Sequence, residues 1–119
     1  EWQEKVDSMH RGFALVGCDT GVPMVPRPKS EAWLLCALQP PAYANCASLE
    51  DASGNDASVN SLKRQLAAVC GGEEPSAEEQ AEWVKTGAVD PLRIDMPSLN
   101  AFKQALHAAA ENAGFPLRP

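Results

Sequence analysis

A short apolar segment enclosed by prolines constrains the fold of this chain most strongly. It covers residues 31–39 (EAWLLCALQ), and Pro40-Pro41 follows it directly. Proline cannot continue a helix, so we expect a helix that ends at Gln39 and begins after the proline-rich residues 21–28. Ser30 is the expected N-cap residue. Because this helix is apolar on nearly every side, the rest of the chain must bury it.

A second apolar run, Gly12–Cys18 (GFALVGC), predicts a β-strand buried on both faces, as in a parallel or mixed sheet. Asp19-Thr20-Gly21 follows it as a turn. Another brief extended segment is expected around Ile94. The segment 42–58 is polar and is expected to be a long loop.

Three more helices are predicted from apolar spacing and from residues typical of helix ends. One covers about 59–70 and ends at Gly71-Gly72, and a second begins at the capping box Ser76-Ala77-Glu78-Glu79. The third covers about 97–113. The predicted fold class is therefore α/β, dominated by helix, with a small, mostly parallel sheet flanked by about four helices.

The length of 119 residues predicts a single domain over residues 1–119. The chain opens at Glu1 without an initiator Met, so we expect it to be a fragment of a longer chain. Its net charge of −6 disfavours binding to phosphate backbones, and nucleic acid is expected as a partner only within a larger, basic protein. A protein partner or a homo-oligomer remains compatible with the composition.

The four cysteines, at positions 18, 36, 46 and 70, show no spacing typical of a zinc site. We predict that they are reduced thiols, and that Cys18 and Cys36 act as small buried apolar residues. There is no signal peptide and no apolar run of membrane-spanning length. We therefore expect a soluble, cytoplasmic domain that does not bind a membrane.

Two carboxylates are candidates for a divalent-metal site. Asp19 follows the predicted strand, and the carboxyl ends of strands are where α/β folds place metal ligands. Glu31, at the start of the predicted helix, offers a second oxygen ligand for Mg²⁺ or Mn²⁺. The alternatives are structural: Asp19 closes a turn, and Glu31 stabilises the helix dipole.

Arg27 and Lys29 precede the same helix, whose free backbone amides could receive an anion such as phosphate. The alternative is that both cations are simply solvated.

The segment Asp51–Asp56 resembles a calcium loop only faintly, and turn formation explains it better. His10 and His107 are isolated, and no motif of a nucleophilic enzyme is present.

These motifs together resemble the later part of some Toprim-like proteins of unknown function. The likeness rests on the strand followed by Asp19 and on four short motifs: Lys29–Leu35 (KSEAWLL), Asn60–Lys63 (NSLK), Trp83–Gly87 (WVKTG) and Ile94–Leu99 (IDMPSL). The resemblance implies a small parallel sheet with flanking helices and a Mg²⁺-dependent role on nucleic acid. However, Gly21 stands where the family has its second Asp, and the strand carrying the family's upstream Glu is absent from this chain.

Three functions are therefore compatible with the sequence. The first is a structural or interaction domain with a remnant metal site at Asp19 and Glu31. The second is a Mg²⁺-dependent nuclease whose other carboxylates lie upstream or on a partner. The third is a small protein-binding module that presents the apolar helix at 31–39.

Overall fold

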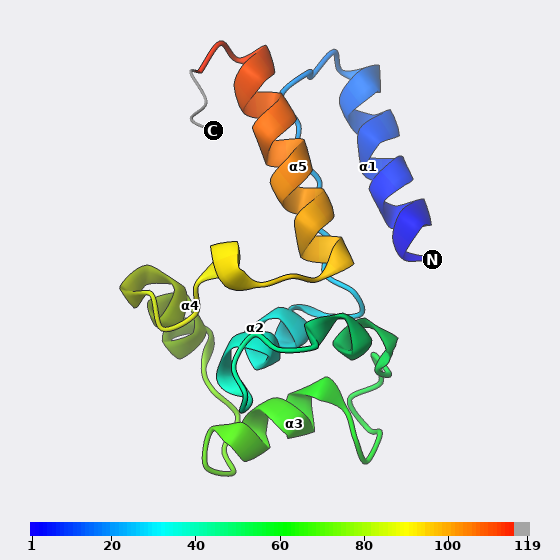
Figure 1. Ribbon diagram of the computed structural model, residues 1–119. Helices are drawn as coiled ribbons and strands as arrows, with labels where there is room; N and C mark the ends of the chain where they lie inside the picture. Colours follow the sequence, from blue (N-terminus) through cyan, green and yellow to red (C-terminus); the bar gives the residue numbers. More distant parts are fainter. Residues whose placement is uncertain (116–119) are drawn as a thin grey trace. The chain divides into compact units, whose positions relative to one another are not determined.

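The computed structural model describes residues 1–115 and contains two compact units (Figure 1). Unit 1 consists of residues 1–25 together with the chain from residue 97 onward, and unit 2 consists of residues 26–96. The elements are, in chain order, α1 (Trp2–Leu15), α2 (Ser30–Leu38), the 3₁₀ helix η1 (Cys46–Asp51), α3 (Leu62–Val69), α4 (Ala77–Thr86), the 3₁₀ helix η2 (Pro91–Arg93) and α5 (Pro97–Asn112).

No β-strand occurs within residues 1–115, so the predicted α/β fold with a parallel sheet is wrong. Where an extended segment was expected, Ile94 follows η2 with extended backbone and is buried, but it belongs to no strand. None of the helices in this part of the chain is long and apolar enough to cross a lipid bilayer.

The residues of the predicted strand Gly12–Cys18 form the last turn of α1 and the bend after it. A short apolar run has the same appearance in a strand and in a helix, and the residues before it decide between the two. Here they favour a helix, because the preceding segment places apolar side chains four, three and four residues apart along one helix face. These side chains are Trp2, Val6, Met9 and Phe13.

Unit 1 consists of two helices and an extended return segment. α1 and α5 lie side by side and run in the same direction (Figure 1), and residues 16–25 lead back from the end of α1 toward its beginning. The indole Nε1–H of Trp2 donates a hydrogen bond of 2.7 Å to the backbone oxygen of Val25. The side-chain Nδ2 of Asn112 donates to the backbone oxygen of Asp19 over 3.1 Å. The return segment is therefore held near both of its ends.

Unit 2 is organised around α2, which confirms the predicted helix at 31–39. Six consecutive residues, Ala32–Ala37, are buried, and α3 and η1 pack against the helix. Leu35 is almost completely buried, and burial of a leucine side chain stabilises a fold by about 2 kcal/mol. The predicted N-cap is displaced by one residue, since Lys29 occupies that position and Ser30 is the first helical residue.

The predicted ends of α3 and α4 are largely confirmed. Ser76 and Glu79 form the expected capping box at the start of α4. Gly71 and Gly72 adopt positive φ after α3, a conformation that glycine adopts without steric cost. The beginning of α3 differs from the prediction: Ser61 is its N-cap, and Val59, where the predicted helix began, lies before the helix and is exposed.

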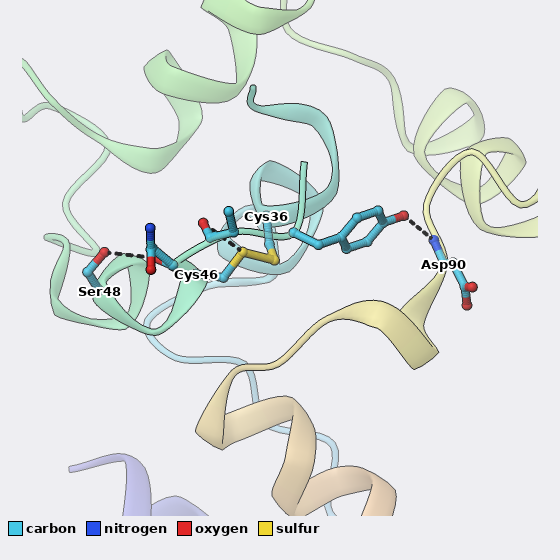
Figure 2. The surroundings of a disulfide bond; sticks show 7 residues. Cys36, Cys46, Ser48 and Asp90 are labelled. Atoms are coloured by element: carbon cyan, nitrogen blue, oxygen red, sulfur yellow. Dashed lines mark hydrogen bonds between the residues drawn. A yellow bond between two sulfur atoms is a disulfide. The ribbon is translucent and has the colours of Figure 1, made fainter. Parts of the chain in front are cut away.

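The predicted loop 42–58 contains η1, which begins at Cys46. A disulfide joins Cys46 to Cys36 in α2 (Figure 2). Tyr43 and Asn45 adopt positive φ between the two cysteines. The backbone N–H of Tyr43 donates to the backbone oxygen of Cys36 over 2.8 Å. These turns return the chain to α2 within ten residues.

The prediction that all four cysteines are reduced is thus wrong for Cys36 and Cys46, whereas Cys18 and Cys70 carry free thiols. Sequence spacing does not reveal the pairing, because it depends on the tight reversal after Pro40-Pro41. Cys18 also departs from the expected buried position, since it is exposed.

The disulfide loop supports a distant segment of unit 2 through Tyr43. The Tyr43 hydroxyl accepts a hydrogen bond of 3.0 Å from the backbone N–H of Asp90, as the dashed line in Figure 2 indicates. The Arg93 guanidinium carbon lies 4.2 Å from the centre of the Tyr43 ring, which is a cation–π contact. The loop therefore anchors the segment that leads through η2.

Replacing both Cys36 and Cys46 by Ala is expected to lower the free energy of unfolding by about 3 kcal/mol, because the closed loop restricts the unfolded chain. Urea unfolding followed by circular dichroism measures this loss. Cys18→Ala is the matched control and should change stability by less than about 0.5 kcal/mol, since Cys18 is exposed. Four reactive thiols in the non-reduced, unfolded protein, instead of two, would contradict the disulfide.

Candidate functional site

The two carboxylates predicted to bind a metal lie in different units. Asp19 is exposed in unit 1, in the bend after α1, and Glu31 is half-buried in the first turn of α2 in unit 2. Within residues 1–115, no group of three or more His, Cys, Asp or Glu side chains lies close enough together to hold a metal ion. The predicted Mg²⁺ or Mn²⁺ site is therefore unsupported, and Glu31 occupies a position where it complements the helix dipole.

At the predicted anion site of Arg27 and Lys29, an acidic side chain of the protein itself binds Lys29. The Lys29 ammonium donates to the Asp56 carboxylate over 2.8 Å, so an acidic side chain already neutralises it. This hydrogen bond raises the pKa of Lys29 and lowers the pKa of Asp56. Arg27 is exposed. The ion pair connects the start of α2 to the loop after η1.

The remaining sequence candidates have structural roles. In the loop that faintly resembles a calcium site, the Asn55 side chain accepts a hydrogen bond from the backbone N–H of Ala57, and Ser53 accepts one from Asn55. These are the expected turn contacts. His107 lies 3.0 Å from Glu111 one turn further along α5, and both side chains are exposed.

A groove of about 350 Å³ lies between α1 and α5 in unit 1. Three segments line it: the last turns of α1, the return segment, and the second half of α5. The lining residues are His10, Phe13, Ala14, Cys18, Asp19, Gly21, Ala105, Ala108, Ala109 and Asn112. The alanines make much of the lining apolar, and Asp19 and Asn112 lie together at the end of α5. This groove is the candidate functional site.

Two close contacts shape the groove. Gly21 passes so near the Phe13 ring that a Cβ atom at this position would overlap the ring carbons. The Phe13 ring in turn meets the His10 ring edge-on, with 6.3 Å between the ring centres. The hydrogen bond from Asn112 to the backbone oxygen of Asp19 joins the last residue of α5 to the return segment. The backbone of Asp19 is thus tied to α5.

Of the residues predicted to form a site, the groove contains only Asp19. Sequence reasoning missed His10, Phe13, Cys18 and Asn112, of which His10 was considered isolated. Asn112 and Asp19 are 93 positions apart, so no local pattern relates them. One signal was present: Gly21, the last residue of the predicted turn, is a residue type that allows the backbone to approach another group closely.

The chain matches no known family model, no curated protein and no solved structure. The Toprim-like resemblance therefore gains no support from relatives, and the parallel sheet that it implied is absent from residues 1–115.

Gly21→Ala is expected to destabilise the protein by about 1–3 kcal/mol, because the added methyl group displaces the Phe13 ring. Gly12→Ala is the matched control: it lies in α1 with open space around its Cβ position, so alanine should stabilise the helix by about 0.5–1 kcal/mol. Urea unfolding of both variants measures the difference. Equal stability of the two variants would show that Phe13 does not pack on Gly21.

The two free thiols are expected to differ in reactivity. Cys18 is exposed, whereas partial burial and the nearby Glu79 carboxylate raise the pKa of Cys70. Since the thiolate is the reactive form, iodoacetamide at pH 8 should alkylate Cys18 well before Cys70. Peptide mass spectrometry over time gives both rates. Faster modification of Cys70 would contradict the expected protection of this thiol by its surroundings.

Proposed function

We propose that this chain is a small protein-binding module and that unit 1 carries its binding surface. The observation that carries the proposal is the open groove between α1 and α5 in a unit that buries little of its own apolar surface. α1 has no buried residue among its fourteen positions. An isolated helix of this length is marginally stable in water, so a bound partner would add the packing that α1 lacks.

Unit 1 also exposes apolar side chains outside the groove. Leu15 and Val16 at the end of α1 are 87% and 78% exposed, and Leu106 on α5 is 50% exposed. They add apolar surface that a larger partner could cover. α2 is a poorer candidate than the sequence suggested, because its apolar residues are buried.

The distribution of charge favours unit 1 as well. Unit 1 contains five acidic and four basic residues, a net charge of −1, whereas the eleven acidic and six basic residues of unit 2 give −5. Charged residues are depleted from the centres of protein interfaces, because their desolvation is costly. The nearly neutral unit is thus better suited to an interface core.

We further infer that the module works in an oxidising compartment rather than in the cytoplasm. Cys36 is completely buried and Cys46 is 2% exposed, so their disulfide is a structural element of unit 2. Structural disulfides persist in oxidising compartments and are rare in the cytosol. This inference replaces the cytoplasmic location expected from the sequence.

Selection from a library of random displayed peptides tests the binding function. Peptides selected on the wild-type protein should lose about tenfold or more in affinity for Ala108→Phe, because the larger side chain fills the groove. Ala81→Phe on α4 is the matched control, an exposed alanine of unit 2, and should leave affinity unchanged. Failure to select any peptide, or equal losses with both variants, would overturn the proposal.

A further inference from the structure

We propose that the groove of unit 1 receives a lysine or arginine side chain of the bound protein, with its cationic head next to Asp19. This inference rests on the proposed binding function and specifies its ligand chemistry. It comes from the groove's charge, its hydrogen-bonding groups and its size.

Within the described residues 1–115, no cationic side chain pairs with the negative charge that Asp19 brings to the groove. Asp19 is its one carboxylate, and no lysine or arginine is among the residues that line the groove. The Asp19 carboxylate forms no ion pair with any other residue in 1–115. The hydrogen bond from Asn112 uses the backbone oxygen of Asp19 and leaves the carboxylate available. A cationic group is therefore the electrostatic complement of this position.

One further group would help to hold a cation. The Asn112 side chain donates through Nδ2, so its carbonyl oxygen can accept a hydrogen bond from an ammonium or guanidinium group. The Phe13 ring also lines the groove, where Gly21 and His10 already contact it, so it contributes apolar surface. The carboxylate and the amide oxygen are the two groups that stabilise positive charge.

The apolar part of the groove fits the stem of such a side chain. The walls contributed by Ala14, Ala105 and Ala108 are apolar. Lysine and arginine have apolar methylene stems that pack along such surfaces while the charged head reaches polar groups. The volume of about 350 Å³ is near the lower limit for ligand sites, which suits one long side chain better than a whole helix.

The charge of the whole chain favours the same partner. With a net charge of −6, the protein attracts basic partners over a distance and repels acidic ones. Unit 1 itself carries only −1, so Asp19 acts as a local charge at the end of an otherwise nearly neutral surface. A basic side chain within an apolar segment is thus the ligand that both features favour.

Titration of the ¹⁵N-labelled protein with two small probes tests this inference. N-acetyl-lysine N-methylamide contains the cation, and N-acetyl-norleucine N-methylamide has a neutral stem of similar length. We expect the lysine probe to shift the amide signals of Asp19, Ala108 and the Asn112 side chain at lower concentrations than the norleucine probe. Asp19→Asn should weaken lysine binding by about fivefold, the effect of losing one exposed charge contact, and leave norleucine binding unchanged.

Two features of the design protect the test from a folding defect. Asn at position 19 retains the backbone oxygen to which Asn112 donates, so unit 1 keeps this contact. Glu111→Gln is the matched control, since it removes a carboxylate next to Asn112 on α5 that does not line the groove. It should not change the affinity for either probe.

The outcomes separate this inference from the proposed function. Equal binding of both probes, no shift with the lysine probe, or equal effects of Asp19→Asn and Glu111→Gln would overturn the cation site. If displayed peptides still bound in the groove, the proposed protein-binding function would be retained, and its ligand would not be a cationic side chain. If neither peptides nor probes bound there, the proposed function and this inference would both be wrong.

Discussion

Burial of α2 is the constraint on which unit 2 depends. A helix that is apolar on nearly all sides gains stability only where other segments cover every side of it. α3 and η1 pack on it, and Leu62 and Leu66 of α3 contribute buried side chains. The Cys36–Cys46 disulfide ties the helix to η1, and Tyr43 between the cysteines connects this loop to Asp90. Most of the irregular chain in unit 2 is thus arranged around one nine-residue helix.

Unit 1 is built on a different principle, with few buried residues and several specific polar contacts. Trp2 and Asn112 donate hydrogen bonds to the backbone of the return segment and hold it along the helices. This arrangement leaves apolar side chains and a groove exposed to solvent. The contrast between a well-packed, acidic unit and a thinly packed, nearly neutral one is the physical basis for the proposal that unit 1 carries the binding surface.

The groove illustrates how residues without a sequence motif form a candidate site through their arrangement. Asp19 is a turn residue in the sequence, and alanines on a helix carry no chemical signal of their own. The return segment brings Asp19 to the end of α5, while Gly21 allows the chain to pass the Phe13 ring. A carboxylate, an amide and an aromatic ring thereby line one apolar hollow, which none of them indicates alone.

Local physical chemistry was sufficient for features whose partners lie within a few residues. The Ser76–Glu79 capping box, the glycines after α3 and the proline stop after α2 could all be predicted, because each depends on neighbouring backbone groups. The site could be predicted only at Asp19. The helix over Gly12–Leu15 continues the apolar spacing that starts at Trp2, which the short run Gly12–Cys18 does not reveal by itself. Tertiary structure alone decided that Cys36 pairs with Cys46 and that Asp19 lies near Asn112. A strand needs a partner strand, a disulfide needs a matching turn, and a groove needs two walls, so each depends on residues distant in the chain.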